Sequence, residues 1–175
     1  ERLPVVFVHG WRGPPFATVY DSEARFLKTW LAERGQPLFY AQGIDSNQPL
    51  YTNAAALRDA IADVRRQTGA SKVHLVGHSM GGLVSRAYLE SALYQSDVAS
   101  LTTLGSPHAG ADQWRDYLLR EIGPGGSREP SARELLPESV AVFNSLGQRP
   151  ADVPYYLLGG DITAHVAGEQ QDENG

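Results

Sequence analysis

Short apolar runs recur along the chain and alternate with longer stretches in which apolar residues stand three or four positions apart. The runs are rich in Val, Leu, Phe and Tyr, and the first one ends at Gly, which is typical of strands buried in a parallel sheet. The pattern predicts strands at residues 3–10, 38–41, 73–76, 98–104 and 153–158.

The stretches between these runs have the periodicity of amphipathic helices. They predict helices at residues 22–34, 53–68, 82–93, 111–122 and 134–146, the last of them continuing through Pro137. Asn53 is expected to cap the second helix, and Gly69 to end it. Alternating strands and helices imply right-handed crossovers between parallel strands. We therefore expect one α/β domain over residues 1–175, with helices on both faces of the sheet.

Composition narrows the range of functions. The 175 residues are 42% hydrophobic and 20% charged, with a net charge of −5 and no cysteine. Scattered Lys and Arg on an acidic chain argue against nucleic-acid binding. The absence of cysteine excludes disulfides, thiol catalysis and cysteine-based zinc sites. No run approaches the ~20 apolar residues of a membrane span. The chain begins at Glu1 without Met, as a processed product would, and we expect an extracellular or periplasmic location.

The strongest chemical signal is Ser79, which lies between Gly77 and Gly81 in the spacing G-x-S-x-G. An apolar strand precedes this motif and a helical pattern follows it, which is the context of a nucleophile elbow. A sharp strand-to-helix turn strains the central residue, and glycines at the flanking positions avoid collisions. The motif predicts an exposed nucleophilic serine at the carboxyl edge of the sheet.

Three segments resemble the α/β-hydrolase fold lipases and esterases, in particular bacterial triacylglycerol lipases. They are VHGW at 8–11, GHSMGG at 77–82 and TLGSPHAG at 103–110. The resemblance implies an α/β-hydrolase sheet and a carboxylic ester hydrolase with Ser79 as nucleophile. It also implies an oxyanion hole formed by the backbone N–H groups of Trp11 and Met80. Neither a cofactor nor a metal is expected.

The histidines within the motifs receive other roles than proton transfer. The resemblance implies that His9 supports the oxyanion loop and that His108 belongs to a loop that shapes the site. His78 occupies a variable position of the elbow, and His74 is expected to pack in the core because it lies inside a predicted strand.

A serine nucleophile needs a base and an orienting acid, which follow it along the chain in this fold. Asp161 directly follows the last predicted strand and is the candidate acid, while the resemblance leaves a residue beyond Gly175 as the alternative acid. His165 is too close behind Asp161 to be a good candidate for the base. The last strand, the catalytic His and the last helix are therefore expected to lie outside this chain. Two alternatives stay open: a second polypeptide or a continuation of the chain supplies the base, or the base has been lost.

Residues 111–122 are expected to form a lid over Ser79, with Trp114, Tyr117 and Leu118 facing the substrate. The alternative is a surface helix packed permanently on the sheet. The predicted function is hydrolysis of acyl lipids through an acyl-enzyme on Ser79. The expected substrate is a lipid or a small ester, and the protein is expected to contact a lipid interface transiently. Phospholipase, thioesterase or polyesterase activity is an alternative on the same machinery, and a catalytically inactive binding module is another.

Overall fold

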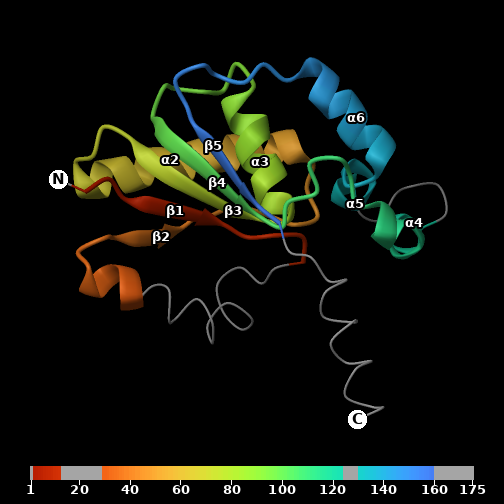
Figure 1. Cartoon of the computed structure of the whole chain (residues 1–175), viewed down its shortest axis with the longest axis horizontal. Coiled ribbons are helices and arrows are strands. Elements are labelled where there is room, and N and C mark those ends of the chain that lie inside the picture. The colour runs from red at the N-terminus through yellow and green to blue at the C-terminus, as the bar shows by residue number, and fades with distance from the viewer. Residues whose placement is uncertain (1, 13–28, 124–129, 160–175) are drawn as a thin grey trace, which may run out of the picture.

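The computed structural model describes residues 2–12, 29–123 and 130–159 of the chain (Figure 1). Within these residues, five strands form one sheet in the order β2-β1-β3-β4-β5, and every neighbouring pair is parallel. The strands are β1 Val5–Val8, β2 Leu38–Tyr40, β3 Val73–His78, β4 Val98–Leu104 and β5 Tyr155–Leu158. The sheet confirms the predicted fold class.

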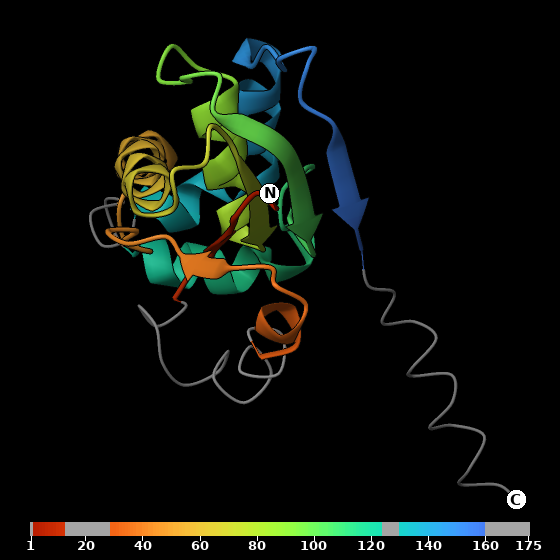
Figure 2. The ribbon, with the colours of Figure 1, turned by 90° about the vertical axis from the view of Figure 1, so that its left-hand side faces the viewer.

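Helices lie on both sides of this sheet (Figure 2). The helices α2 Leu50–Thr68 and α3 Met80–Leu89 cover one face and pack against each other. A short helix at residues 29–33 lies beside β2 on the opposite side, and the rest of the predicted helix 22–34 falls outside the described residues. After β4 come the 3₁₀ turn η1 Asp112–Trp114, then α4 Arg115–Ile122, α5 Pro130–Glu134 and α6 Pro137–Leu146.

The core lies between the sheet and the face formed by α2 and α3. Leu57 and Ile61 of α2, Leu83 of α3 and Leu75 of β3 are completely buried there. Burial of such side chains stabilises each by about 1.5–3 kcal/mol relative to exposure. On the other face of β3 the side chains are only half-buried, and they include His74, whose Nδ1 lies 2.8 Å from Ser100 Oγ. The predicted core position of His74 was therefore wrong.

The start of α2 differs from the prediction. The helix begins at Leu50 after Pro49, so Asn53 lies inside its first turn and does not cap it. The Asn53 side chain is buried and instead donates to the carbonyl oxygens of Asp45 and Gln48, at 2.7 and 3.1 Å. The amide of Leu50 donates to a carboxylate oxygen of Glu134 at 2.6 Å, which satisfies one of the unpaired N–H groups of the first turn.

The other corrections concern helix boundaries. The segment predicted as one helix over 134–146 is divided, because α5 ends at Glu134 and Pro137 occupies the first turn of α6. Proline suits the start of a helix but removes a backbone donor inside one. The helix predicted over 82–93 is α3 Met80–Leu89, which ends four residues earlier than predicted, and Gly69 ends α2 in the left-handed conformation, as predicted.

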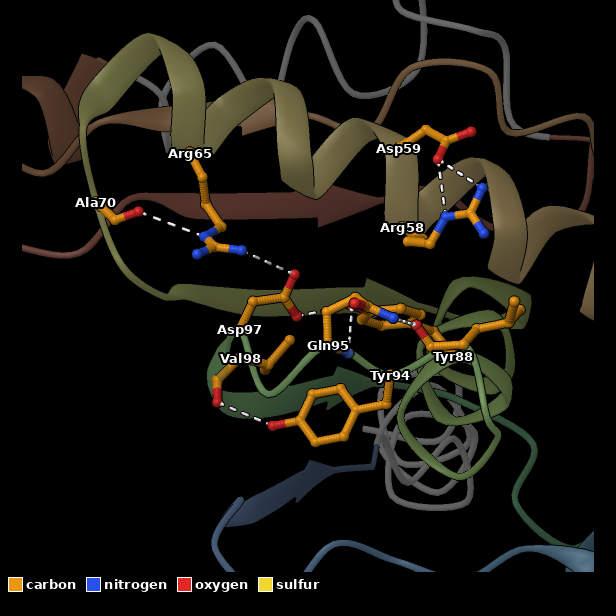
Figure 3. Close-up of polar contacts among 10 residues, drawn as sticks. Arg58, Asp59, Arg65, Ala70, Tyr88, Tyr94, Gln95, Asp97 and Val98 are labelled. Carbon is orange, nitrogen blue, oxygen red and sulfur yellow. Dashed lines mark hydrogen bonds and ion pairs between the residues drawn. The ribbon is translucent and has the colours of Figure 1, made fainter.

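A buried polar network at the start of β4 connects α2, α3 and the sheet (Figure 3). Asp97 is only 2% exposed, accepts a 2.7 Å hydrogen bond from the Tyr88 hydroxyl, and lies 3.4 Å from Arg65 Nη1. Burial, together with the hydrogen bond to Asp97 and its charge, raises the pKa of Tyr88. Because the carboxylate has both a hydrogen-bond donor and a cation, its burial is compensated.

Candidate active site

Ser79 occupies a strained turn between β3 and α3. Its backbone has φ 52° and ψ −122°, a conformation that residues other than glycine rarely adopt. A Cβ atom at Gly77 would lie 2.6 Å from the amide nitrogen of Gly82, and one at Gly81 would lie 2.2 Å from the carbonyl oxygen of Val8. Gly77 is therefore needed for the turn itself, and Gly81 for the close approach of β1 to the turn.

Hydrogen bonds fix the turn from both sides. The Ser79 amide donates to the carbonyl oxygen of Leu104 at the end of β4, at 2.9 Å, and the Gly82 amide donates to the Ser79 carbonyl oxygen at 3.1 Å. The segment after β4 also reaches the turn, because a Cβ at Gly82 would lie 2.0 Å from Ser106 Oγ. Ser106 Oγ is itself buried without a hydrogen-bond partner among the described residues.

The end of β1 brings the predicted oxyanion loop to Ser79. A Cβ at Gly10 would lie 2.9 Å from the Cβ of Ser79, so only glycine allows this approach. Trp11 follows and shares a cavity wall with Ser79. Met80 is the first residue of α3, and the first amide groups of a helix have no acceptor within the helix. The predicted donors, Trp11 and Met80, therefore lie on two segments that meet at Ser79, while their role stays a prediction.

His9 is buried and holds the oxyanion loop in place. Its Nδ1 lies 2.9 Å from the carbonyl oxygen of Gly10, and its Nε2 lies 3.3 Å from that of Ile44. A carbonyl oxygen only accepts and a neutral imidazole carries one N–H, so one ring nitrogen donates to its carbonyl oxygen and the other only lies near its own. This geometry agrees with the supporting role that the resemblance implies for His9.

Two cavities of the described structure meet at Ser79. The first has a volume of about 330 Å³ and is largely walled by apolar side chains, namely Trp11, Trp114, Tyr117, Leu118 and Leu135. The second has a volume of about 440 Å³ and is lined by the segment after β4, by Asp112 and Gln113, and by Gly159. Gly159 directly follows β5, so the carboxyl end of that strand also borders the site.

Two of these wall residues were not predicted. Arg12 lines the first cavity, and its position directly after the oxyanion loop is a signal that could have marked it. Leu135 lies between α5 and α6, where the sequence predicted the interior of a helix, and nothing in its pattern pointed to the site.

His108 lies behind the segment that lines the second cavity. Its Nε2 lies 3.0 Å from Thr103 Oγ1, and Arg86 Nη1 lies 3.3 Å from its Nδ1. Burial, and then the positive charge of Arg86, lower the pKa of His108. Because the guanidinium only donates, Nδ1 accepts and the proton of the neutral ring is on Nε2. His108 therefore has a structural role in this arrangement. Burial also lowers the pKa of His78, the residue before the nucleophile.

The segment 111–122 forms η1 and α4 and does not form one continuous helix. Trp114 is 56% exposed at the cavity wall, whereas Leu118 and Ile122 are 1% and 6% exposed and belong to the core. The Arg115 guanidinium makes two 2.9 Å hydrogen bonds to the carboxylate of Glu138 on α6. Whether the segment moves as a lid stays a prediction.

The predicted acid Asp161 and the alternative base His165 lie outside the described residues. Across the described ranges, His, Asp and Glu side chains form no group of three that could hold a metal ion. None of the described helices combines the length and apolar character needed to cross a membrane.

Comparison with known proteins shows the family to which the chain belongs. Residues 4–121 match the family model described as the alpha/beta hydrolase fold. A triacylglycerol lipase of Pseudarthrobacter phenanthrenivorans is 38% identical over 114 residues, which are 63% of this chain and 35% of the lipase. The lysosomal thioesterase PPT2 of Rattus norvegicus is 36% identical over 122 residues, which are 66% of this chain and 37% of the thioesterase.

The fold is also that of solved lipases. The mature form of the Bacillus licheniformis lipase BlEst2 superimposes with a TM-score of 0.71 at 22% identity, over 91% of this chain and 66% of that one. The chain spans between about a third and about half of the length of the curated relatives it matches. The motif order, the sheet and the matched family model lead to one conclusion: the chain belongs to the α/β hydrolase-fold family.

Proposed function

We propose that the protein is a serine ester hydrolase that acts on acyl lipids. The observation that carries this proposal is the strained elbow at Ser79, which borders both cavities. An ester has an acyl part and an alcohol part on either side of its carbonyl carbon. The cavity walled by Trp114, Tyr117 and Leu118 suits the acyl chain, and the second cavity suits the alcohol.

In the proposed reaction, Ser79 Oγ attacks the carbonyl carbon and gives its proton to a general base. The amides of Trp11 and Met80 donate to the oxygen that becomes negative in the tetrahedral intermediate. Collapse of that intermediate expels the alcohol, which takes the proton from the base, and leaves an acyl group on Ser79. Water then repeats the sequence and releases the acid. Two fixed amide donors stabilise the charge without the reorganisation that water would need.

The base belongs to a part of the protein outside the described residues. We propose that a continuation of the chain or a second polypeptide supplies it, next to β5. In the described part of the chain β5 is an edge strand, and Tyr156, Leu157 and Leu158 are 55%, 63% and 56% exposed. Apolar side chains on both faces of an edge strand favour a further strand and a covering helix. Asp161 is the proposed acid, and His165 is the alternative base within this chain.

Intact mass spectrometry of an active preparation tests this point. We expect a species heavier than the 19.0 kDa of this chain, or a second species beside it. Full activity from the 19.0 kDa chain alone would contradict the proposal and favour His165 as the base.

An extracellular or periplasmic location and transient contact with a lipid interface stay part of the proposed function.

Labelling with a fluorophosphonate probe tests the hydrolase itself. An activated serine reacts with this probe, so we expect a covalent adduct on Ser79 and the loss of esterase activity with it. A protein that stays unlabelled would instead be a binding module that uses the fold without its chemistry. The similarity to a thioesterase supports acyl thioesters as an alternative substrate class. Comparing the turnover of an acyl thioester with that of the matching oxygen ester decides between thioesterase and esterase activity.

A further inference from the structure

Arg12 connects the oxyanion loop to α4. Its Nη1 donates a 2.9 Å hydrogen bond to the Tyr117 hydroxyl, and its Nη2 forms an ion pair with the carboxylate of Glu121. Arg12 directly follows Trp11, and its own backbone is in the left-handed region, with φ 53°. A non-glycine residue in this conformation is maintained by the contacts around it.

Ring contacts extend this connection to Trp11. The Arg12 guanidinium lies 4.8 Å from the centre of the Trp11 ring, and that ring packs against Tyr117 in an edge-to-face arrangement with a centroid distance of 5.8 Å. Trp11 Nε1 is buried and has no hydrogen-bond acceptor among the described residues. Among the described residues, the indole is therefore held by its packing against the core and by its contacts with the arginine and the tyrosine, and not by a hydrogen bond.

Among the described residues, Arg12 connects the carboxylate of Glu121 to the site. Arg12 and Tyr117 line the cavity that Ser79 borders, whereas Glu121 is not among the described residues that line the cavities at Ser79. The side chains of Arg12 and Glu121 are 42% and 27% exposed. Ion pairs this exposed contribute little to folding stability, because solvent screens them and the long side chains lose entropy.

We propose that Arg12, held by Glu121 and Tyr117, is a positioning residue that fixes the backbone N–H of Trp11 toward the oxyanion. The inference rests on the proposed hydrolase function. An oxyanion donor is effective only when its orientation is set before the charge develops, and a shift of about 1 Å can cost about a hundredfold in rate. Through Trp11, Arg12 therefore acts on the transition state, in addition to any contact that its side chain makes with the ester as part of the cavity wall.

A second ion pair on α4 provides the matched comparison. Arg115 and Glu138 tie the same helix to α6, with side chains that are 41% and 55% exposed, and neither residue is among those that line the cavities at Ser79. If Arg12 only anchored α4, loss of the Glu121 carboxylate and loss of the Glu138 carboxylate would have the same effect on the rate. If it positions Trp11, loss of the Glu121 carboxylate alone lowers the rate of the chemical step.

The experiment compares E121Q, R12M, the double variant and E138Q in the full-length protein. The measurements are kcat and KM on a short-chain ester, the inhibition constant of an alkyl boronic acid, and the midpoint of thermal unfolding. We expect E121Q to lower kcat roughly tenfold with KM nearly unchanged, and to weaken the boronic acid by a similar factor. R12M should lower kcat at least as much as E121Q does, and the double variant should lower it no further than R12M. E138Q should keep the wild-type kcat.

The conservative variant R12K adds a further readout. Lysine keeps the charge but cannot bind Glu121 and Tyr117 together with a planar fork, so we expect only partial recovery of kcat. Equal kcat values for E121Q and E138Q would overturn the proposal, and so would a change confined to KM. If R12M does not fold, E121Q still decides the matter. A wild-type protein that neither turns over esters nor reacts with a fluorophosphonate contradicts the proposed function itself.

Discussion

Gly81 at the start of α3 lies directly against Val8 at the end of β1. A Cβ atom on this glycine would be 2.2 Å from the carbonyl oxygen of Val8, and 2.6 Å from that of His9. Real Cβ contacts are never this short, so the approach of the two segments depends on the missing side chain. The same contact brings Gly10 and Trp11 beside Ser79.

We therefore expect G81A to destabilise the fold by roughly 3 kcal/mol or more, because the backbone of β1 or α3 must move. The control is G69A at the end of α2, where φ is 72° but no heavy atom lies within 4 Å of the added Cβ. That variant carries only the local strain of about 1–2 kcal/mol. Equilibrium unfolding in urea compares the two. Equal losses would show that the contact with Val8 adds nothing.

S79A should abolish ester hydrolysis and fluorophosphonate labelling while leaving the fold intact. Loss of a serine nucleophile reduces turnover by roughly four orders of magnitude or more. Alanine has the same strain as serine at φ 52°, and the removed hydroxyl borders open cavities, so no void forms in the core. We expect the free energy of unfolding to change by about 0.5 kcal/mol at most. Unchanged turnover by the pure variant would rule out the mechanism.

The fold should lose stability in mild acid because of His108. Burial and Arg86 lower its pKa in the folded protein below the ordinary value of 6.5, which the unfolded chain keeps. Between the two values the unfolded state binds more protons, so the free energy of unfolding falls as the pH falls below about 6.5. His78 adds to the same trend, because burial also lowers its pKa.

The variant H108Q tests this assignment, since Gln does not titrate. It should be less stable than the wild type near neutral pH, because the contacts with Thr103 and Arg86 are weakened. Between about pH 7.5 and about pH 5.5, on either side of the ordinary His pKa, it should lose less stability than the wild type does. Parallel urea midpoints for both proteins across this range would show that His108 does not carry the acid sensitivity.

The elbow could be predicted because its requirements are local. A strand, a tight turn and a helix must follow within a few residues, so the glycines beside Ser79 are visible in the sequence itself. The break before α6 was also visible, because Pro137 favours the first turn of a helix over its interior. The apolar periodicity continues on both sides of this proline and therefore resembles that of a single helix.

Other features depend on residues far apart in the chain. The N-terminus of α2 is satisfied by Glu134, 84 positions after Leu50, so no local pattern could replace the predicted cap at Asn53. Arg12 reaches Tyr117 across 105 positions, and its place in the cavity wall follows from the packing of α4. Hydrophobic periodicity specifies which face of a helix is buried, but it does not specify which polar groups meet across the fold.

The last prediction concerns η1 and α4 as a lid. Trp114 is exposed beside the cavity at Ser79, whereas Leu118 and Ile122 are buried in the core, so movement of the whole helix would expose two apolar side chains. Such exposure is costly in water and favourable at a lipid surface. We therefore expect activity on an insoluble ester to rise sharply above the concentration at which an interface forms.

W114S should weaken that rise more than it slows hydrolysis of a short soluble ester, because the indole contributes apolar surface to the interface. The matched control is L146S on α6, where an apolar side chain is 69% exposed but does not line the cavities at Ser79. Rates on both esters are measured across the solubility limit of the longer one. Equal losses on the two substrates, or smooth saturation without a rise, would mean that α4 is a helix packed permanently on the domain.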